Sequence, residues 1–235
     1  MVRKNSSLKK ILILVCMLAV PGFLYYLLTE KGKNRYKPLA VFGSKQVAST
    51  FHTKRGKQIP DTLYHTIRDF SLTNQAGRTI NFPASPKKIT IVNFFYSSCP
   101  SFCTKMNKEM QRVEQTFRKN DFVRFMSITV DPETDTANQL SNYSKTFGAA
   151  AGKWDFLTGD KELIYDLAKK DFLVDALPDP GMPGNIIHSP MLILVDPHKR
   201  IRGFYDSGSR ERVDILIDEI KVLIAEELRK DESGR

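Results

Sequence analysis

The residues best suited to chemistry are two cysteines, Cys99 and Cys103, which are separated by three residues. They follow a strand-like apolar run and precede a helical pattern, and Pro100 suits the first helical position, which makes Cys99 the cap residue. The N–H groups and the dipole of a helix N-terminus favour a thiolate, so we expect this position to lower the thiol pKa. Thiolates serve both metal binding and dithiol redox chemistry.

Three interpretations of the cysteine pair compete. A thioredoxin-type redox motif has two intervening residues, so the three between Cys99 and Cys103 favour metal binding over pure dithiol exchange. A purely structural disulfide would contribute little stability, because so short a loop removes little chain entropy. The third cysteine, Cys16, lies in an apolar run and is interpreted as a buried helix residue.

One histidine is a candidate for a further ligand. Two thiolates suit soft Cu(I), whereas Cu(II) or Zn(II) prefers an additional nitrogen or oxygen ligand. His188 precedes an apolar strand pattern that begins at Met191. On the residues alone, ligation and ordinary packing of His188 are equally consistent with the sequence. The remaining histidines are interpreted as solvated or surface residues: His52, His65 and His198.

An aspartate and two methionines near the cysteines have alternative roles. Asp131 follows a predicted strand, and the carboxyl ends of neighbouring strands face the same crevice, so it is a candidate for orienting a ligand or tuning the thiolates. Its alternative role is to cap the turn before Thr136. Met106 and Met110 are soft donors, but their helical spacing indicates core packing.

The elements that would position these residues form an α/β pattern. Period-two or continuous apolar runs predict strands at 65–72, 79–82, 88–96, 122–130, 154–157, 191–195 and 201–205. Helical spacing or caps predict helices at 101–117, 136–147, 160–168 and 213–228. This order predicts a mixed sheet in a single thioredoxin-like domain over residues 64–230.

The N-terminal part has a different composition. Residues 1–10 form a basic tail, and residues 11–28 are eighteen positions without a charge, which predicts a single transmembrane helix that is retained as an anchor rather than cleaved. Residues 29–63 are polar and basic and are interpreted as a tether. The net charge of +10 is scattered, with clusters beside the apolar run, which favours a membrane surface and argues against nucleic acid as a partner.

Several segments together resemble the Sco/SenC family in order and spacing. They are Asn93-Phe-Phe-Tyr-Ser-Ser-Cys-Pro-Ser-Phe-Cys103, Ser127-Ile-Thr-Val-Asp-Pro-Glu-Thr-Asp-Thr136, Phe156-Leu-Thr-Gly159 and His188-Ser-Pro-Met-Leu-Ile-Leu-Val-Asp196. The resemblance covers about residues 64–228. Thr104 stands where the family usually has a second proline, and Ser97-Ser98 replaces the more usual Thr-His pair, but no proposed ligand is lost.

The resemblance implies a site and a function. Copper, as Cu(I) or Cu(II), would be held by Cys99, Cys103 and His188, with Asp131 close to the metal. The protein would be a membrane-anchored copper metallochaperone that serves cytochrome c oxidase subunit 2 or another extracytoplasmic copper protein. It would be a single-pass protein of the bacterial inner membrane, with its soluble domain on the periplasmic or outer side.

Two enzymatic alternatives remain. In a thiol-disulfide oxidoreductase acting on extracytoplasmic cysteines, Cys99 would be the attacking thiolate and Cys103 the resolving residue, so that these two would be the catalytic residues and a disulfide bond between them a redox state. A peroxiredoxin-like peroxidase is the weaker alternative, because nothing beyond the cysteine pair favours it.

Overall fold

The computed structural model describes residues 5–26, 38–54, 56–83, 88–100, 102–178 and 186–233. The chain divides into two compact units, residues 1–37 and residues 38–235. In the first unit, α1 (Asn5–Tyr26) is a helix with Pro21 inside it. In the part of the chain that is described, no helix is both long and apolar enough to cross a membrane. Residues 27 and 28 of the expected span at 11–28 lie outside the described residues.

The second unit begins with a hairpin where the sequence predicted only a polar tether. β1 (Lys45–Lys54) and β2 (Lys57–Tyr64) pair antiparallel with an irregularity between Val47 and Phe51. The large apolar side chains of this hairpin are exposed, among them Val47, Phe51 and Leu63. Because neither face needs to be buried in the core, the strands lack the apolar alternation by which strands are predicted. Residues 29–37 of the expected tether lie outside the described residues.

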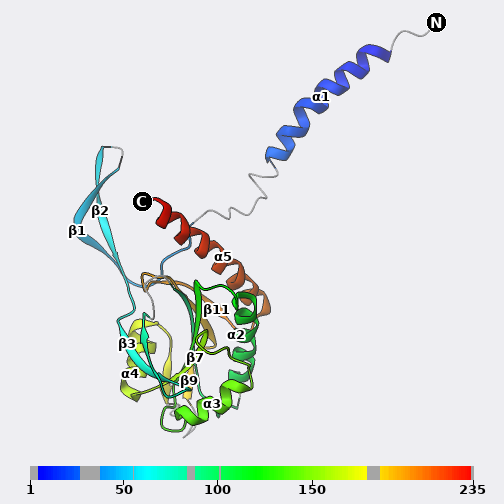
Figure 1. The fold of residues 1–235 in the computed structure, drawn as a ribbon. Coiled ribbons are helices and arrows are strands. Elements are labelled where there is room, and N and C mark those ends of the chain that lie inside the picture. The colour runs from blue at the N-terminus through cyan, green and yellow to red at the C-terminus, as the bar shows by residue number, and fades with distance from the viewer. Residues whose placement is uncertain are drawn as a thin grey trace. The chain divides into compact units, whose positions relative to one another are not determined.

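A seven-stranded mixed sheet forms the centre of the second unit (Figure 1). Its strand order is β11-β10-β5-β6-β7-β3-β4, in which β5, β6 and β7 are parallel to one another and the other neighbours are antiparallel. The strands span β3 (Phe70–Asn74), β4 (Thr79–Phe82), β5 (Ile89–Phe95), β6 (Val123–Thr129), β7 (Trp154–Thr158), β10 (Met191–Val195) and β11 (Ile201–Asp206). Every residue of β5 is buried, as expected for a central strand covered on both faces.

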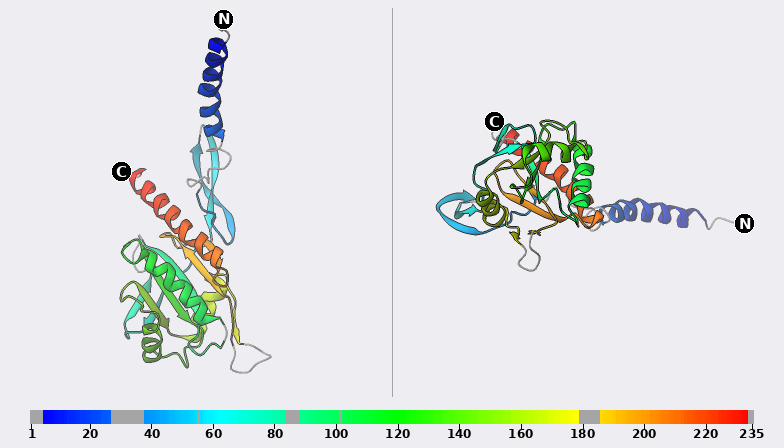
Figure 2. Two further views of the ribbon diagram at one scale, coloured as in Figure 1. Left: turned by 90° about the vertical axis from the view of Figure 1, so that its right-hand side faces the viewer. Right: turned by 90° about the horizontal axis from the view of Figure 1, so that it is seen from below.

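Helices cover both faces of this sheet. They are α2 (Cys103–Phe117), α3 (Ala137–Lys145), α4 (Lys161–Asp166), which a π-helical turn (Leu167–Asp171) extends, and α5 (Arg210–Ser233). The crossovers through α2 and α3 continue across the sheet in one direction, so right-handed connections place both helices on the same face. Figure 2 shows α2, in green, beside α5, in orange to red, on this face. α4 lies on the opposite face (Figure 1).

The helix starts follow local sequence signals. Thr136 caps α3 by accepting a hydrogen bond from the Gln139 N–H, and Asp160 caps α4 by accepting one from the Leu163 N–H. Both caps confirm the sequence prediction.

A short antiparallel pair of strands, β8 (Ala176–Pro178) and β9 (Ile186–His188), lies between the π-helical turn and β10 in the chain.

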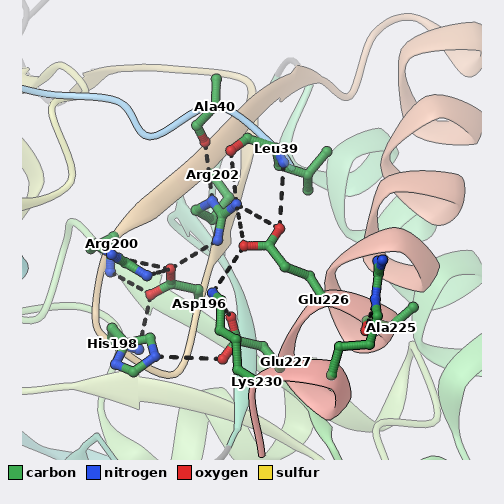
Figure 3. Close-up of polar contacts among 11 residues, drawn as sticks. Leu39, Ala40, Asp196, His198, Arg200, Arg202, Ala225, Glu226, Glu227 and Lys230 are labelled. Atoms are coloured by element: carbon green, nitrogen blue, oxygen red, sulfur yellow. Dashed lines mark hydrogen bonds and ion pairs between the residues drawn. The ribbon is translucent and has the colours of Figure 1, made fainter. Parts of the chain in front are cut away.

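A buried cluster of charges ties the start of the second unit to β11 and α5 (Figure 3). The Arg202 guanidinium donates to the carbonyl oxygens of Leu39 and Ala40 at 2.8 and 3.1 Å. It also pairs with the carboxylates of Asp196 and Glu226 at 3.1 and 2.9 Å. The buried guanidinium is therefore both hydrogen-bonded and paired with carboxylates, and a buried charge is tolerated under these conditions.

Candidate metal centre

The two cysteines lie in and after the loop that connects β5 to α2. β5 ends at Phe95, and Phe102 occupies the N-cap position, so Cys103 is the first residue of α2. Cys99 lies in the loop before the helix, where its N–H donates to the Tyr96 carbonyl oxygen at 3.3 Å. The prediction that Pro100 opens the helix with Cys99 as its cap is therefore wrong by three residues.

The loop brings the two thiols together. The side chains of Cys99 and Cys103 share a hydrogen bond. Cys99 is half-buried, whereas only 1% of the Cys103 surface is exposed. In the described part of the chain neither residue takes part in a disulfide, so the disulfide stays a prediction. One partly accessible sulfur beside one buried sulfur is an arrangement suited to a metal ion that arrives from outside.

The expected lowering of the thiol pKa is wrong for Cys103. Burial raises the pKa of this thiol, and the neighbouring Cys99 and the negative charge of Asp135 act in the same direction. A hydrogen bond with the Tyr96 backbone opposes the shift without cancelling it. The helix N-terminus is worth at most about 2 kcal/mol to a charge, and here the desolvation of a buried thiolate outweighs it.

Asp135, one of the groups that raise the Cys103 pKa, was not predicted from the sequence as a residue of the site. Its side chain is fully buried and accepts hydrogen bonds from the Ser97 N–H at 3.0 Å, from the Ser97 hydroxyl and from the Thr129 hydroxyl. Ser97 belongs to the cysteine loop and Thr129 ends β6, so one carboxylate joins the two strand ends. The only available signal was its place in the Asp131–Thr136 turn after a buried strand.

The predicted aspartate, Asp131, lies in the same turn but is partly exposed. Its N–H donates to the Thr129 hydroxyl at 3.0 Å, and its carbonyl oxygen accepts from the Asp135 N–H at 2.9 Å. Its backbone therefore supports the turn that positions Asp135, and capping of this turn by the Asp131 side chain stays a prediction. The role of the Asp131 side chain beside a metal stays a prediction.

The third predicted ligand, His188, is described only by its backbone. β10 pairs antiparallel with β5, so the start of β10 lies at the sheet edge where β5 ends. His188 closes β9, three residues before Met191 opens β10. Its side chain is outside the described part of the chain. Among the side chains that are described, no three His, Cys, Asp or Glu residues are grouped so that they could hold a metal ion.

The other candidates from the sequence have structural partners. His52 contacts Asp61 at 2.7 Å, the His65 ring shares a hydrogen bond with the Asp171 carbonyl oxygen at 2.7 Å, and His198 lies 3.5 Å from Glu227. His65 is half-buried rather than a surface residue. Met106 and Met110 are fully buried in the core, as predicted.

A chain of largely buried polar groups connects three neighbouring strands, β7, β6 and β5, with α2 and α3. The Trp154 N–H donates to the Ser127 hydroxyl, which donates to the Asn93 carbonyl oxygen, at 2.9 and 2.6 Å. The Asn93 amide donates to Asn107 at 2.9 Å, and the Asn107 amide donates to the Tyr143 hydroxyl at 3.1 Å. Burial raises the pKa of Tyr143 to about 12, and the charges of Cys103, Cys99 and Asp135 contribute to the shift.

Comparison with known proteins identifies the family. The SCO1/SenC family model matches residues 60–225. An SCO2-like protein of Rickettsia conorii is 30% identical over 221 residues, which cover 92% of this chain and 98% of the relative. The chain belongs to the SCO1/SenC family, and the resemblance predicted from its motifs is confirmed.

Solved structures agree with this family and its thioredoxin-like α/β fold. The structure of Arabidopsis thaliana ScoI with copper bound has a TM-score of 0.55 and 26% identity, and the match covers 66% of this chain and 97% of that one. BsSco, described as a member of the Sco family of cytochrome c oxidase assembly proteins with a disulfide switch, has a TM-score of 0.59 and 25% identity. That match covers 67% of this chain and 92% of BsSco.

Proposed function

We propose that this protein is a copper metallochaperone that assists assembly of the copper centre of cytochrome c oxidase. The observation that carries the proposal is the meeting of the Cys99 and Cys103 thiols at the carboxyl end of β5. Thiolate sulfur is the donor that Cu(I) prefers, and the imidazole of His188 would complete a set that also accepts Cu(II). Copper bound to the ScoI relative from Arabidopsis thaliana supports this choice of metal.

The copper ion is cargo in this proposal, and the chain supplies the groups that hold and release it. Because burial favours the protonated Cys103, the thiol must lose its proton when copper binds. The half-buried Cys99 is the sulfur that an incoming ion or an acceptor site reaches first. The acceptor we propose is cytochrome c oxidase subunit 2 or another extracytoplasmic copper protein.

Copper titration of the purified full-length chain tests the site. We expect about one copper ion per chain, and replacement of either cysteine by serine abolishes binding of Cu(I). His188→Ala should weaken Cu(II) binding by about ten-fold or more and Cu(I) binding far less. His198→Ala, which removes an exposed histidine, is the matched control and should leave both affinities unchanged. Equal Cu(II) affinity in His188→Ala would overturn the three-ligand site.

We also propose that the N-terminal segment anchors the protein in the bacterial inner membrane, with the second unit outside the cytoplasm. The apolar side chains of α1 are exposed, including Leu12, Leu18 and Phe23. The basic residues before this segment favour a cytoplasmic N-terminus. Membrane fractions washed with alkaline carbonate should retain the full chain. Release by this wash would contradict an integral anchor.

A thiol-disulfide oxidoreductase is the second candidate, because the same two thiols are in contact. The Cys99 thiolate would attack a partner disulfide and release one partner thiolate, which takes up a proton. The Cys103 thiolate would then attack the Cys99 sulfur and release the second partner thiolate. The partner is reduced by two electrons while Cys99 and Cys103 are oxidised to a disulfide.

A deletion strain separates the two functions. If the protein delivers copper, added copper should restore cytochrome c oxidase activity in the strain. If the protein reduces thiols, copper alone should not restore activity, and a small dithiol reductant should. Complementation with the His188→Ala variant sharpens the result, since thiol exchange needs only the two cysteines.

A further inference from the structure

Asp135 is a buried carboxylate whose hydrogen bonds all come from neutral groups. Two donors belong to Ser97 and one to Thr129, and none of the side chain is exposed. Among the described residues, its side-chain donors are these neutral groups and include no lysine or arginine. Hydrogen bonds from neutral donors stabilise a buried charge without neutralising it.

The position of this carboxylate couples two strand ends. Ser97 follows β5 by two residues and precedes Cys99 by two, so its N–H bond to Asp135 fixes the first turn of the cysteine loop. Thr129 is the last residue of β6, which pairs parallel with β5 through Phe95 and Thr129. The Asp135 side chain therefore links the cysteine loop to the end of the neighbouring strand.

We propose that Asp135 is a positioning residue of the metal centre, which holds the Ser97–Cys99 turn against the end of β6 and keeps a negative charge beside the ligands. This inference rests on the proposed copper function for its second part. The negative charge of Asp135 would be offset by the positive charge of a bound copper ion. The fixed turn preorganises the sulfur positions before the ion arrives.

The test uses three variants in the full-length chain. Asp135→Asn keeps the shape but removes the charge and offers only one acceptor oxygen to three donors. Ser97→Ala removes one donor and keeps the main-chain bond, and Thr129→Val removes the donor from β6. Asp155→Asn is the matched control, because Asp155 is also buried but pairs with Arg124 at 2.6 Å and with Asn74 at 2.9 Å.

Copper binding tests the role of the Asp135 charge, and amide hydrogen exchange tests whether Asp135 holds the Ser97–Cys99 turn. In Asp135→Asn we expect Cu(I) affinity to fall about ten-fold or more and the Cu(II) absorption bands to shift, with smaller changes in Ser97→Ala and Thr129→Val. Amide hydrogen exchange at Ser97 should accelerate about ten-fold or more in Asp135→Asn without copper. Asp155→Asn should lower the melting temperature and leave the copper bands and the Ser97 exchange unchanged.

The outcomes are distinguishable. An unchanged Ser97 exchange rate in Asp135→Asn overturns the positioning role, whether or not copper binds. Wild-type copper affinity and bands in that variant overturn the role of the charge. If the wild-type chain binds no copper, the proposed function fails, whereas the exchange measurement still decides the positioning role. Should Asp135→Asn not fold, Ser97→Ala and Thr129→Val give the same two measurements.

Discussion

Two buried carboxylates, Asp135 and Asp196, occupy similar places in the fold but have opposite surroundings. Each lies in the connection that follows a strand of the central sheet, β6 for Asp135 and β10 for Asp196. Asp196 pairs with the guanidinium groups of Arg200 and Arg202 at 2.9 and 3.1 Å (Figure 3). Asp135 accepts hydrogen bonds from two hydroxyl groups and one backbone N–H.

The difference separates a structural charge cluster from the proposed copper site. Around Arg202 the charges are matched, and hydrogen bonds from Arg202 and Lys230 hold the pKa of Glu226 below its ordinary value although burial alone would raise it. In the described part of the chain, the hydrogen bonds to the Asp135 side chain come from neutral groups only. A region with matched charges gains nothing from an added ion, whereas the cysteine region gains a counter-ion when a metal cation binds.

The largest expected effect comes from breaking the matched cluster. Arg202→Ala leaves Asp196 and Glu226 without their buried partner and frees the Leu39 and Ala40 carbonyl oxygens. We expect a loss of about 3–5 kcal/mol in the free energy of unfolding, measured by urea denaturation. Copper stoichiometry at a temperature where the variant is folded should be unchanged, and a loss of copper binding there would contradict the separation of the two regions.

A smaller loss of stability is expected when the hydrogen bond between Asn107 and Tyr143 is removed. Tyr143→Phe removes the acceptor of the Asn107 amide, which is buried, and should cost about 1–3 kcal/mol in the free energy of unfolding. Tyr165→Phe, at a partly exposed tyrosine, is the control and should cost much less. A comparable loss in both variants would show that the buried polar chain adds no stability of its own.

Proton release gives the next effect. Because the pKa of Cys103 is raised, the proposed binding of copper should displace a proton from its thiol, so the apparent copper affinity should rise about ten-fold, or about 1.4 kcal/mol, per pH unit below that pKa. In the metal-free protein a raised thiol pKa stabilises the fold at low pH, and this contribution should decline as the pH rises above the ordinary value of 9.0. Isothermal titration in buffers of different ionisation enthalpy measures the proton count, and zero protons released would contradict the buried thiol.

The smallest effect is expected at the rim of the matched cluster. His198→Ala removes an exposed side chain that lies 3.5 Å from Glu227. We expect a change below about 1 kcal/mol in the free energy of unfolding, because exposed ion pairs contribute little. A loss as large as that of Arg202→Ala would show that the rim and the buried centre of the cluster act as one unit.

Much of the fold followed from patterns along the chain. Apolar runs predicted β5, β6 and β10 to within two residues, and helical spacing predicted α2 and α5. The hairpin of β1 and β2 was missed, because its strands expose apolar side chains such as Val47 and Phe51 instead of alternating them against a core.

The candidate site was predicted in part. Two cysteines separated by three residues at a strand-to-helix junction are a local feature, so their role as a candidate pair followed from the sequence, whereas the hydrogen bond between their side chains is seen only in the structure. The direction of the Cys103 pKa shift did not, because it depends on how deeply α2 is buried in the core. Asp135 was not predicted as a site residue, because an acidic residue in a turn is ordinarily exposed. Its burial arises only when the strand ends pack together.

The sequence by itself determined the family, the order of the strands and helices that build the central sheet and its two faces, and the pair of neighbouring thiols, because these depend on residue types and short spacings. Only the tertiary structure decided the protonation preference of Cys103 and the partners of Asp135 and Arg202. Those properties depend on desolvation and on groups that are far apart in the chain, such as Leu39 and Glu226. Burial and long-range hydrogen bonding arise when the sheet and helices pack, so no local pattern contains them.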